Sequence, residues 1–171
     1  MGIAFGRLDG KRNRLFDAEV NAVLGTKMLR VLMICLLWPS FLVAGDYREP
    51  ERGSATRSSM MNAIRPHAEW NFGPPVEFVV SDLRVSGNVG YASLEPQRPG
   101  GDQIDLATTP MAAFGGYDPE FSDGASMHVL YQLSGDTWVA VHWSIGATDV
   151  WFAAPEFCRI WVDVIPEFCG G

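Results

Sequence analysis

The chain has 171 residues, enough for one globular domain, and 47% of them are hydrophobic. From Asp46 onward it carries 17 acidic residues against 7 arginines and no lysine, a net charge of −10. This balance excludes a nucleic-acid binder, which needs a basic surface, and disfavours binding to anionic lipid. Without lysine, this part of the chain also cannot form the Schiff base of a lysine-dependent enzyme.

An apolar segment near the N-terminus is typical of a secretory signal peptide. Residues 28–45 hold Arg30, an apolar run and small residues at Ala44 and Gly45. The run is shorter than the roughly 20 apolar residues of a membrane span, and Pro39 interrupts it. We therefore expect cleavage near Gly45 and a periplasmic or secreted protein, which contacts the membrane only through this segment before cleavage. An uncleaved anchor or a buried helix is the alternative.

The segments on either side of the apolar run differ in character. Residues 1–27 show no fold pattern, and we interpret them as a mis-called leader, with Met28 as the better start. Residues 46–57 are polar and predict a flexible lead. Residues 58–171 are then predicted to form a single α+β domain.

The first predicted elements of this domain are a helix and a hairpin. Ser58 or Ser59 is the expected helix cap, and Gly73 with the prolines after it is the expected stop. The hairpin has strands over 76–85 and 90–95, joined by a turn that contains a Gly-Asn pair. The long segment 104–123 follows, rich in glycine, proline and aromatic residues. It is expected either to cover a pocket as a lid or to be tacked onto the domain.

A second hairpin over 125–145 is predicted to form the floor of the core. Its odd positions are apolar, the period of half-buried strands. These positions are Met127, Val129, Tyr131, Leu133, Val139, Val141, Trp143 and Ile145. If both strands turn their odd positions to the core, a three-residue loop pairs residue 133 with 137. A two-residue Gly-Asp turn would pair 134 with 137 instead, which we consider less favourable.

These elements predict an α+β fold. The N-terminal helix is expected to pack on a four-stranded antiparallel sheet, with the other sheet face open and a short C-terminal helical segment after the second hairpin. Pro155 suits the start of that segment.

The cysteine count fits an oxidising compartment. Cys35 lies in the apolar segment, which leaves Cys158 and Cys169 for the mature chain. We predict that these two form a disulfide. A metal pair is the alternative, but the pair lacks zinc-site spacing and a nearby histidine.

His128 and His142 are the main candidate ligand-binding residues. The three-residue loop would place them directly opposite each other, with Cβ atoms about 5 Å apart. Two neutral imidazoles so placed are able to bind a metal or transfer a proton. Alternatively, they only pack on the mixed face of the hairpin, beside Trp138.

Other polar residues give weaker indications. Asp149 follows a glycine turn at a strand end, where it either faces a pocket or caps a helix. Arg84 and Arg98 either grip an anion or balance nearby acids.

Five short stretches resemble small exported bacterial proteins of unknown function, from about Glu51 to Phe152. They are Asn62-Ala-Ile-Arg-Pro, Val76-Glu-Phe-Val-Val, Leu83-Arg-Val-Ser-Gly, Glu95-Pro-Gln-Arg-Pro-Gly-Gly and Gly146-Ala-Thr-Asp-Val-Trp. The expected layout also resembles the cystatin-like or NTF2-like type, in which a curved sheet wraps a helix. The resemblance implies export and this architecture, and it carries over no catalytic residue.

Together these patterns predict an exported, non-catalytic binding or interaction domain. Its expected partner is an envelope component or another exported protein, with no cofactor and no metal. The sequence lacks Gly-x-Ser-x-Gly, His-Glu-x-x-His and phosphate-loop motifs. The alternative is a small enzyme or ligand carrier with a pocket between sheet and helix. Trp138, Trp143, His128 and His142 would line that pocket, under the 104–123 loop.

Overall fold

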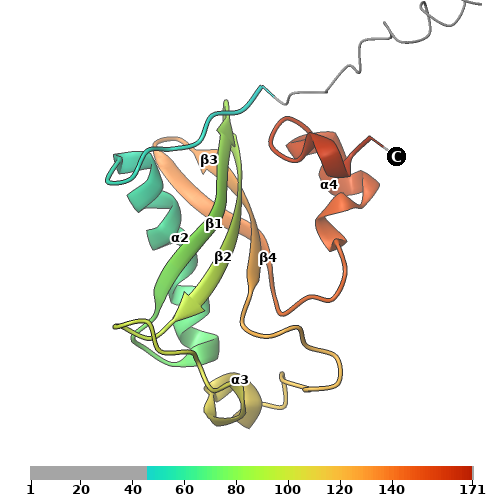
Figure 1. Ribbon diagram of the computed structural model, residues 1–171. Helices are drawn as coiled ribbons and strands as arrows, with labels where there is room; N and C mark the ends of the chain where they lie inside the picture. Colours follow the sequence, from blue (N-terminus) through green and yellow to red (C-terminus); the bar gives the residue numbers. More distant parts are fainter. Residues whose placement is uncertain (1–45, 171) are drawn as a thin grey trace, which may run out of the picture. The chain divides into compact units, whose positions relative to one another are not determined.

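The computed structural model describes residues 46–170, which form one helix layer, one sheet and a C-terminal segment. The helices are α2 (Ala55–Phe72), α3 (Pro110–Ala113) and α4 (Pro155–Trp161), and the strands are β1 (Glu77–Ser86), β2 (Val89–Gln97), β3 (Met127–Ser134) and β4 (Thr137–Ile145). Figure 1 shows α2 against one side of the sheet and α4 on the other side. This confirms the predicted α+β class, the antiparallel sheet and the short C-terminal helix.

Helix α2 begins earlier than predicted. The Ser54 hydroxyl accepts the Arg57 backbone N–H at 3.2 Å, so Ser54 is the cap and the prediction of Ser58 or Ser59 is wrong. Residues 55–57, expected in a flexible lead, therefore belong to the helix. The buried side chains recur every fourth residue and form one apolar stripe against the sheet: Met60, Ile64, Ala68 and Phe72.

The sheet is a meander in the order β1-β2-β3-β4. Both hairpins have two-residue turns, because Ser86 pairs with Val89 and Ser134 pairs with Thr137. Gly135 in the second turn has φ +59°, which favours glycine and fits this tight turn type. The expected three-residue loop is therefore wrong.

A β-bulge in β4 then changes which residues face α2. Near the turn Tyr131 pairs with Ala140, but Leu130 pairs with His142, so Val141 is the extra residue. Trp138 and Ala140 consequently lie in the α2 core, whereas Val139 and Val141 are 40% and 36% exposed. Beyond the bulge Trp143 and Ile145 pack on that core, as predicted.

The sheet face away from α2 was expected to be open, but part of it is covered. A C-terminal cap, defined here as residues 150–170, covers the end of this face nearest the β1–β2 turn. Trp161 is buried there and donates its Nε1–H to the Tyr131 carbonyl at 2.8 Å. The Cys158–Cys169 disulfide closes the cap, with 5.4 Å between the Cα atoms.

The 104–123 segment has structure of its own. It contains the 3₁₀ turn η1 (Leu106–Thr108) and α3, and Thr109 caps α3 through its hydroxyl. Tyr117 packs on the α2 core, while Phe114 and Phe121 are exposed. Tyr117 thus holds the segment against the domain.

The predicted leader over 1–27 and signal peptide over 28–45 lie outside the described residues. Within the described part of the chain, no helix is long and apolar enough to span a bilayer.

The interior between α2 and the sheet is filled. Its largest side chains are fully buried: Met60, Ile64, Phe72, Leu83, Leu94, Met127, Val129 and Tyr131. Only the Tyr131 hydroxyl lacks a hydrogen-bond partner among the buried side-chain polar atoms of residues 46–170, and burial raises the pKa of Tyr131. This hydroxyl is therefore a local cost to stability.

Tyr131→Phe removes this hydroxyl and keeps the ring. We expect the free energy of unfolding to stay the same or rise by up to about 1–3 kcal/mol, because an unpaired buried polar group is removed. Urea denaturation measures it. The matched control is Tyr91→Phe, whose hydroxyl is hydrogen-bonded to His128 and whose loss should cost about 1 kcal/mol. Equal losses in both variants would contradict the prediction.

Candidate functional site

A strip of polar side chains crosses the sheet face opposite α2. On β2, Ala92 and Leu94 face the α2 core, so the alternating residues Ser93 and Glu95 face the other way. Ser93 pairs with His128 on β3, and His128 pairs with Ser144 on β4. The register thus aligns two hydroxyls and one imidazole across three strands.

His128 is held in this strip by Tyr91. The Tyr91 hydroxyl lies 2.9 Å from His128 Nδ1, and Phe152 of the cap packs against both rings. Burial lowers the pKa of His128, and burial followed by the charge of Asp82 raises the pKa of Tyr91. At neutral pH both groups are therefore uncharged, and the tautomer of the imidazole decides which of the two donates the hydrogen bond.

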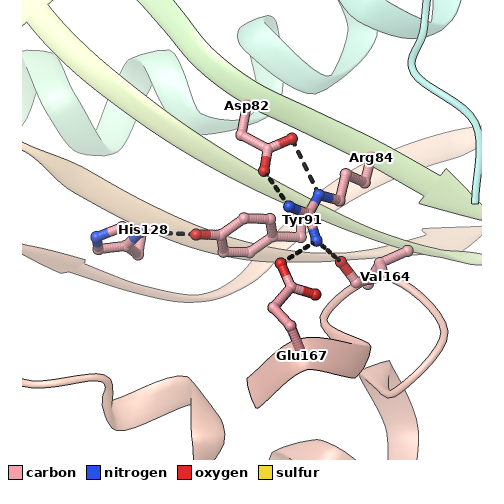
Figure 2. Close-up of polar contacts among 6 residues, drawn as sticks. All are labelled: Asp82, Arg84, Tyr91, His128, Val164 and Glu167. Atoms are coloured by element: carbon pink, nitrogen blue, oxygen red, sulfur yellow. Dashed lines mark hydrogen bonds and ion pairs between the residues drawn. The ribbon is translucent and has the colours of Figure 1, made fainter. Parts of the chain in front are cut away.

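Arg84 joins strand β1 to the cap, as Figure 2 shows. Its guanidinium binds both carboxylate oxygens of Asp82, with Nε–Oδ1 and Nη2–Oδ2 distances of 3.0 and 2.6 Å. From the same group, Nη1 donates to the Val164 carbonyl at 3.2 Å and to Glu167 Oε1 at 2.6 Å. Burial opposes the charged form, but the two carboxylates outweigh it and raise the pKa of Arg84. Arg84 therefore balances nearby acids and fastens the cap.

A polar cleft opens at the end of β2 away from the cap. It has a volume of about 650 Å³ and lies between the end of β2, residues 101–106 and residues 123–126. Two carboxylates, two carboxamides and a hydroxyl line it: Glu95, Asp123, Gln97, Gln103 and Ser126. Glu95 follows Ser93 on the same face, and Ser126 precedes His128 by two residues. The cleft therefore adjoins the polar strip at Glu95.

Two smaller hollows lie elsewhere on the described surface. One, of about 490 Å³, is beside the Cys158–Cys169 disulfide, and the other, of about 400 Å³, is beside Arg57 and Phe78. The cleft and the hollow beside Arg57 border the α2 core, because Ile104 lines the first and Met61 and Phe78 line the second.

The prediction that His128 and His142 lie directly opposite each other is wrong. The two-residue turn and the bulge pair His142 with Leu130 and His128 with Ser144. Both imidazoles do face the cap side, where His142 packs on Phe157 and Trp161 at ring distances of 4.9 and 5.6 Å. Within residues 46–170 no group of three or more His, Cys, Asp or Glu is placed to hold a metal ion.

The other predicted ligand-binding residues do not join the histidines. Trp138 is buried in the α2 core, on the opposite face of the sheet. Asp149 is exposed, and the helical turns after it begin at Trp151 and Pro155 without a side-chain cap. The proposed cap role of Asp149 is therefore wrong, and the four residues do not meet in one concavity.

Sequence reasoning missed Tyr91, Ser93 and Ser144. Ser93 and Glu95 alternate with the apolar residues Ala92 and Leu94, which was the one available signal for a polar face. The contact between Tyr91 and His128 depends on pairing between β2 and β3, which are 29 residues apart. No sequence pattern specifies that pairing.

No protein-family model, curated protein or solved structure gives a significant match to this chain.

Arg84→Met removes the charged link between sheet and cap. We expect faster amide exchange and faster proteolysis in residues 150–170, because the bonds to Glu167 and the Val164 carbonyl are lost. The free energy of unfolding should fall by about 1–3 kcal/mol. We expect a value near the lower end of this range, because the side chains of Asp82 and Glu167 are 32% and 44% exposed. Arg159→Met, at an exposed position of α4, is the matched control. Unchanged exchange in the cap would contradict the role of Arg84.

His128 predicts a loss of stability in acid. Because burial lowers its folded-state pKa below the ordinary 6.5, the unfolded chain binds the proton first as the pH falls. Stability should therefore decline below about pH 6.5, and His128→Gln should reduce this decline. Urea denaturation at several pH values tests it. The Tyr91→Phe variant should keep most of this loss of stability in acid, because burial of His128 is the main cause of its lowered pKa. An identical pH dependence in wild type and His128→Gln would refute the assignment.

Proposed function

We propose that this chain is an exported, non-catalytic binding domain that contacts an envelope component or another exported protein. The observation that carries the proposal is the filled interior between α2 and the sheet, because it leaves no chamber there for a substrate. The remaining polar concavity is an open cleft at the surface, a form suited to recognition of an external partner.

Export is supported by two features. The segment 28–45 has the composition of a signal peptide, and the domain contains a disulfide, which persists in oxidising compartments. As part of the same proposal, the chain resembles small exported bacterial proteins, and its layout resembles the cystatin-like or NTF2-like architecture.

An exposed aromatic pair also supports binding. Trp70 and Phe114 are 71% and 68% exposed and stack with 6.1 Å between ring centroids. Exposed aromatic rings of this size are enriched where proteins contact partners.

The alternative, a small enzyme or carrier with a pocket between sheet and helix, receives less support. Its expected lining splits between the two sheet faces, with Trp138 on one and His128 on the other.

Secretion of the full chain in a bacterial host tests the proposal. We expect the mature protein outside the cytoplasm, with its N-terminus near Asp46 and no free thiol, as measured by intact mass and thiol titration. A Leu36→Arg/Leu37→Arg variant, which interrupts the apolar run, is the control and should stay inside the cell.

Two outcomes would contradict the proposal. One is residues 1–26 found in the mature protein, which would defeat the export assignment. The other is turnover of a substrate in a hydrolase panel that disappears in His128→Gln or His142→Ala, which would establish an enzyme.

A further inference from the structure

The cleft at the end of β2 has the size of a small-molecule site. Its volume of about 650 Å³ falls within the roughly 300–1,000 Å³ of ligand pockets. It lies at the end of β2 away from the cap, where Glu95 and Gln97 come from the sheet face opposite α2. Its other side is formed by residues at the margin of the α2 core, Ile104, Leu106 and Ala125. A ligand can therefore reach it from solvent without movement of the cap.

The charge of the cleft disfavours anions. Its lining includes Glu95 and Asp123 and no arginine or lysine. Arg98, next to Gln97 in sequence, is turned to the C-terminal end of α2, where it donates to the carbonyls of Phe72, Gly73 and Pro75. A phosphate or carboxylate ligand would meet only negative charge here.

The hydrogen-bonding groups of the cleft match a ligand rich in hydroxyls. Carboxylates only accept, while the amides of Gln97 and Gln103 both donate and accept. Beside them, the partly exposed Leu106, backed by the buried Pro96 and Ile104, supplies an apolar wall. A sugar ring combines these two requirements, because it carries hydroxyls at its rim and C–H groups on its face.

The polar strip extends this surface along the strands. Ser93 stands two residues before Glu95, about 7 Å along β2, and His128 stands two residues after Ser126. Further donors and acceptors therefore continue from the cleft toward the cap. This continuity favours a chain of sugars over a single ring.

We propose that this cleft binds a neutral oligosaccharide. The inference rests on the proposed function, because it names the chemical class of the envelope component that the domain would contact. Hydrogen bonds to Glu95, Gln97, Gln103 and Asp123 would fix the hydroxyls, and the apolar wall would pack on one ring face.

The test is calorimetric titration of the secreted, oxidised protein with three neutral probes, triacetylchitotriose, cellotriose and maltotriose. We expect at least one of them to bind, with little change in affinity between about 0.05 and about 0.5 M NaCl, since the ligand is uncharged. Gln97→Ala and Gln103→Ala should each weaken binding about tenfold through lost hydrogen bonds. Gln132→Ala, at an exposed position of β3 outside the cleft, should bind normally.

Three results would overturn the oligosaccharide proposal. No binding of any of the three probes would remove it, while the secretion and hydrolase results would still decide the proposed function. Tight, salt-sensitive binding of spermidine without sugar binding would make the cleft a cation site. Sugar binding that survives both cleft variants but is lost in Trp70→Ala would place the site at the aromatic pair.

Discussion

The sheet buries apolar side chains on both of its faces, and each face needs its own cover. On one face the cover is α2, whose stripe of Met60, Ile64, Ala68 and Phe72 fills the main core. On the other it is the C-terminal cap, where Trp161, Val164 and Ile165 pack on Val89, Tyr91 and Leu130. Without the cap these three sheet residues would be exposed to water, so the second core depends on the last 21 described residues.

The cap covers only part of its face, and this division creates the candidate site. Arg84 and the Trp161 indole fasten the cap near the β1–β2 turn. The rest of the face carries Ser93, Glu95 and His128, and of these three only His128 packs against apolar rings, those of Tyr91 and Phe152. Polar groups are stable here because water or a ligand can reach them. The same arrangement thus closes a core at one end and leaves a polar surface at the other.

The bulge at Val141 makes both covers possible. Without an extra residue, the register set by the tight Gly135 turn would turn Trp143 and Ile145 away from α2. With it, Trp138 and Ala140 face the core before the bulge, and Trp143 and Ile145 face it after the bulge. His142 is then placed on the cap side, where Phe157 and Trp161 are its neighbours.

The sequence alone determined the α+β class, the two hairpins and the start of α4 at Pro155, because these follow from local periodicity and from turn and proline residues. It also indicated the Cys158–Cys169 pair from the residues left after the apolar segment. Tertiary structure decided the register of β3 and β4, the facing of the histidines and the placement of Trp138. One residue more or less in a strand reverses its faces, and a single bulge leaves no mark in the alternation of the sequence. The Tyr91–His128 contact, the Arg84 link and the cleft likewise join residues that are distant in the chain, and only packing brings them together.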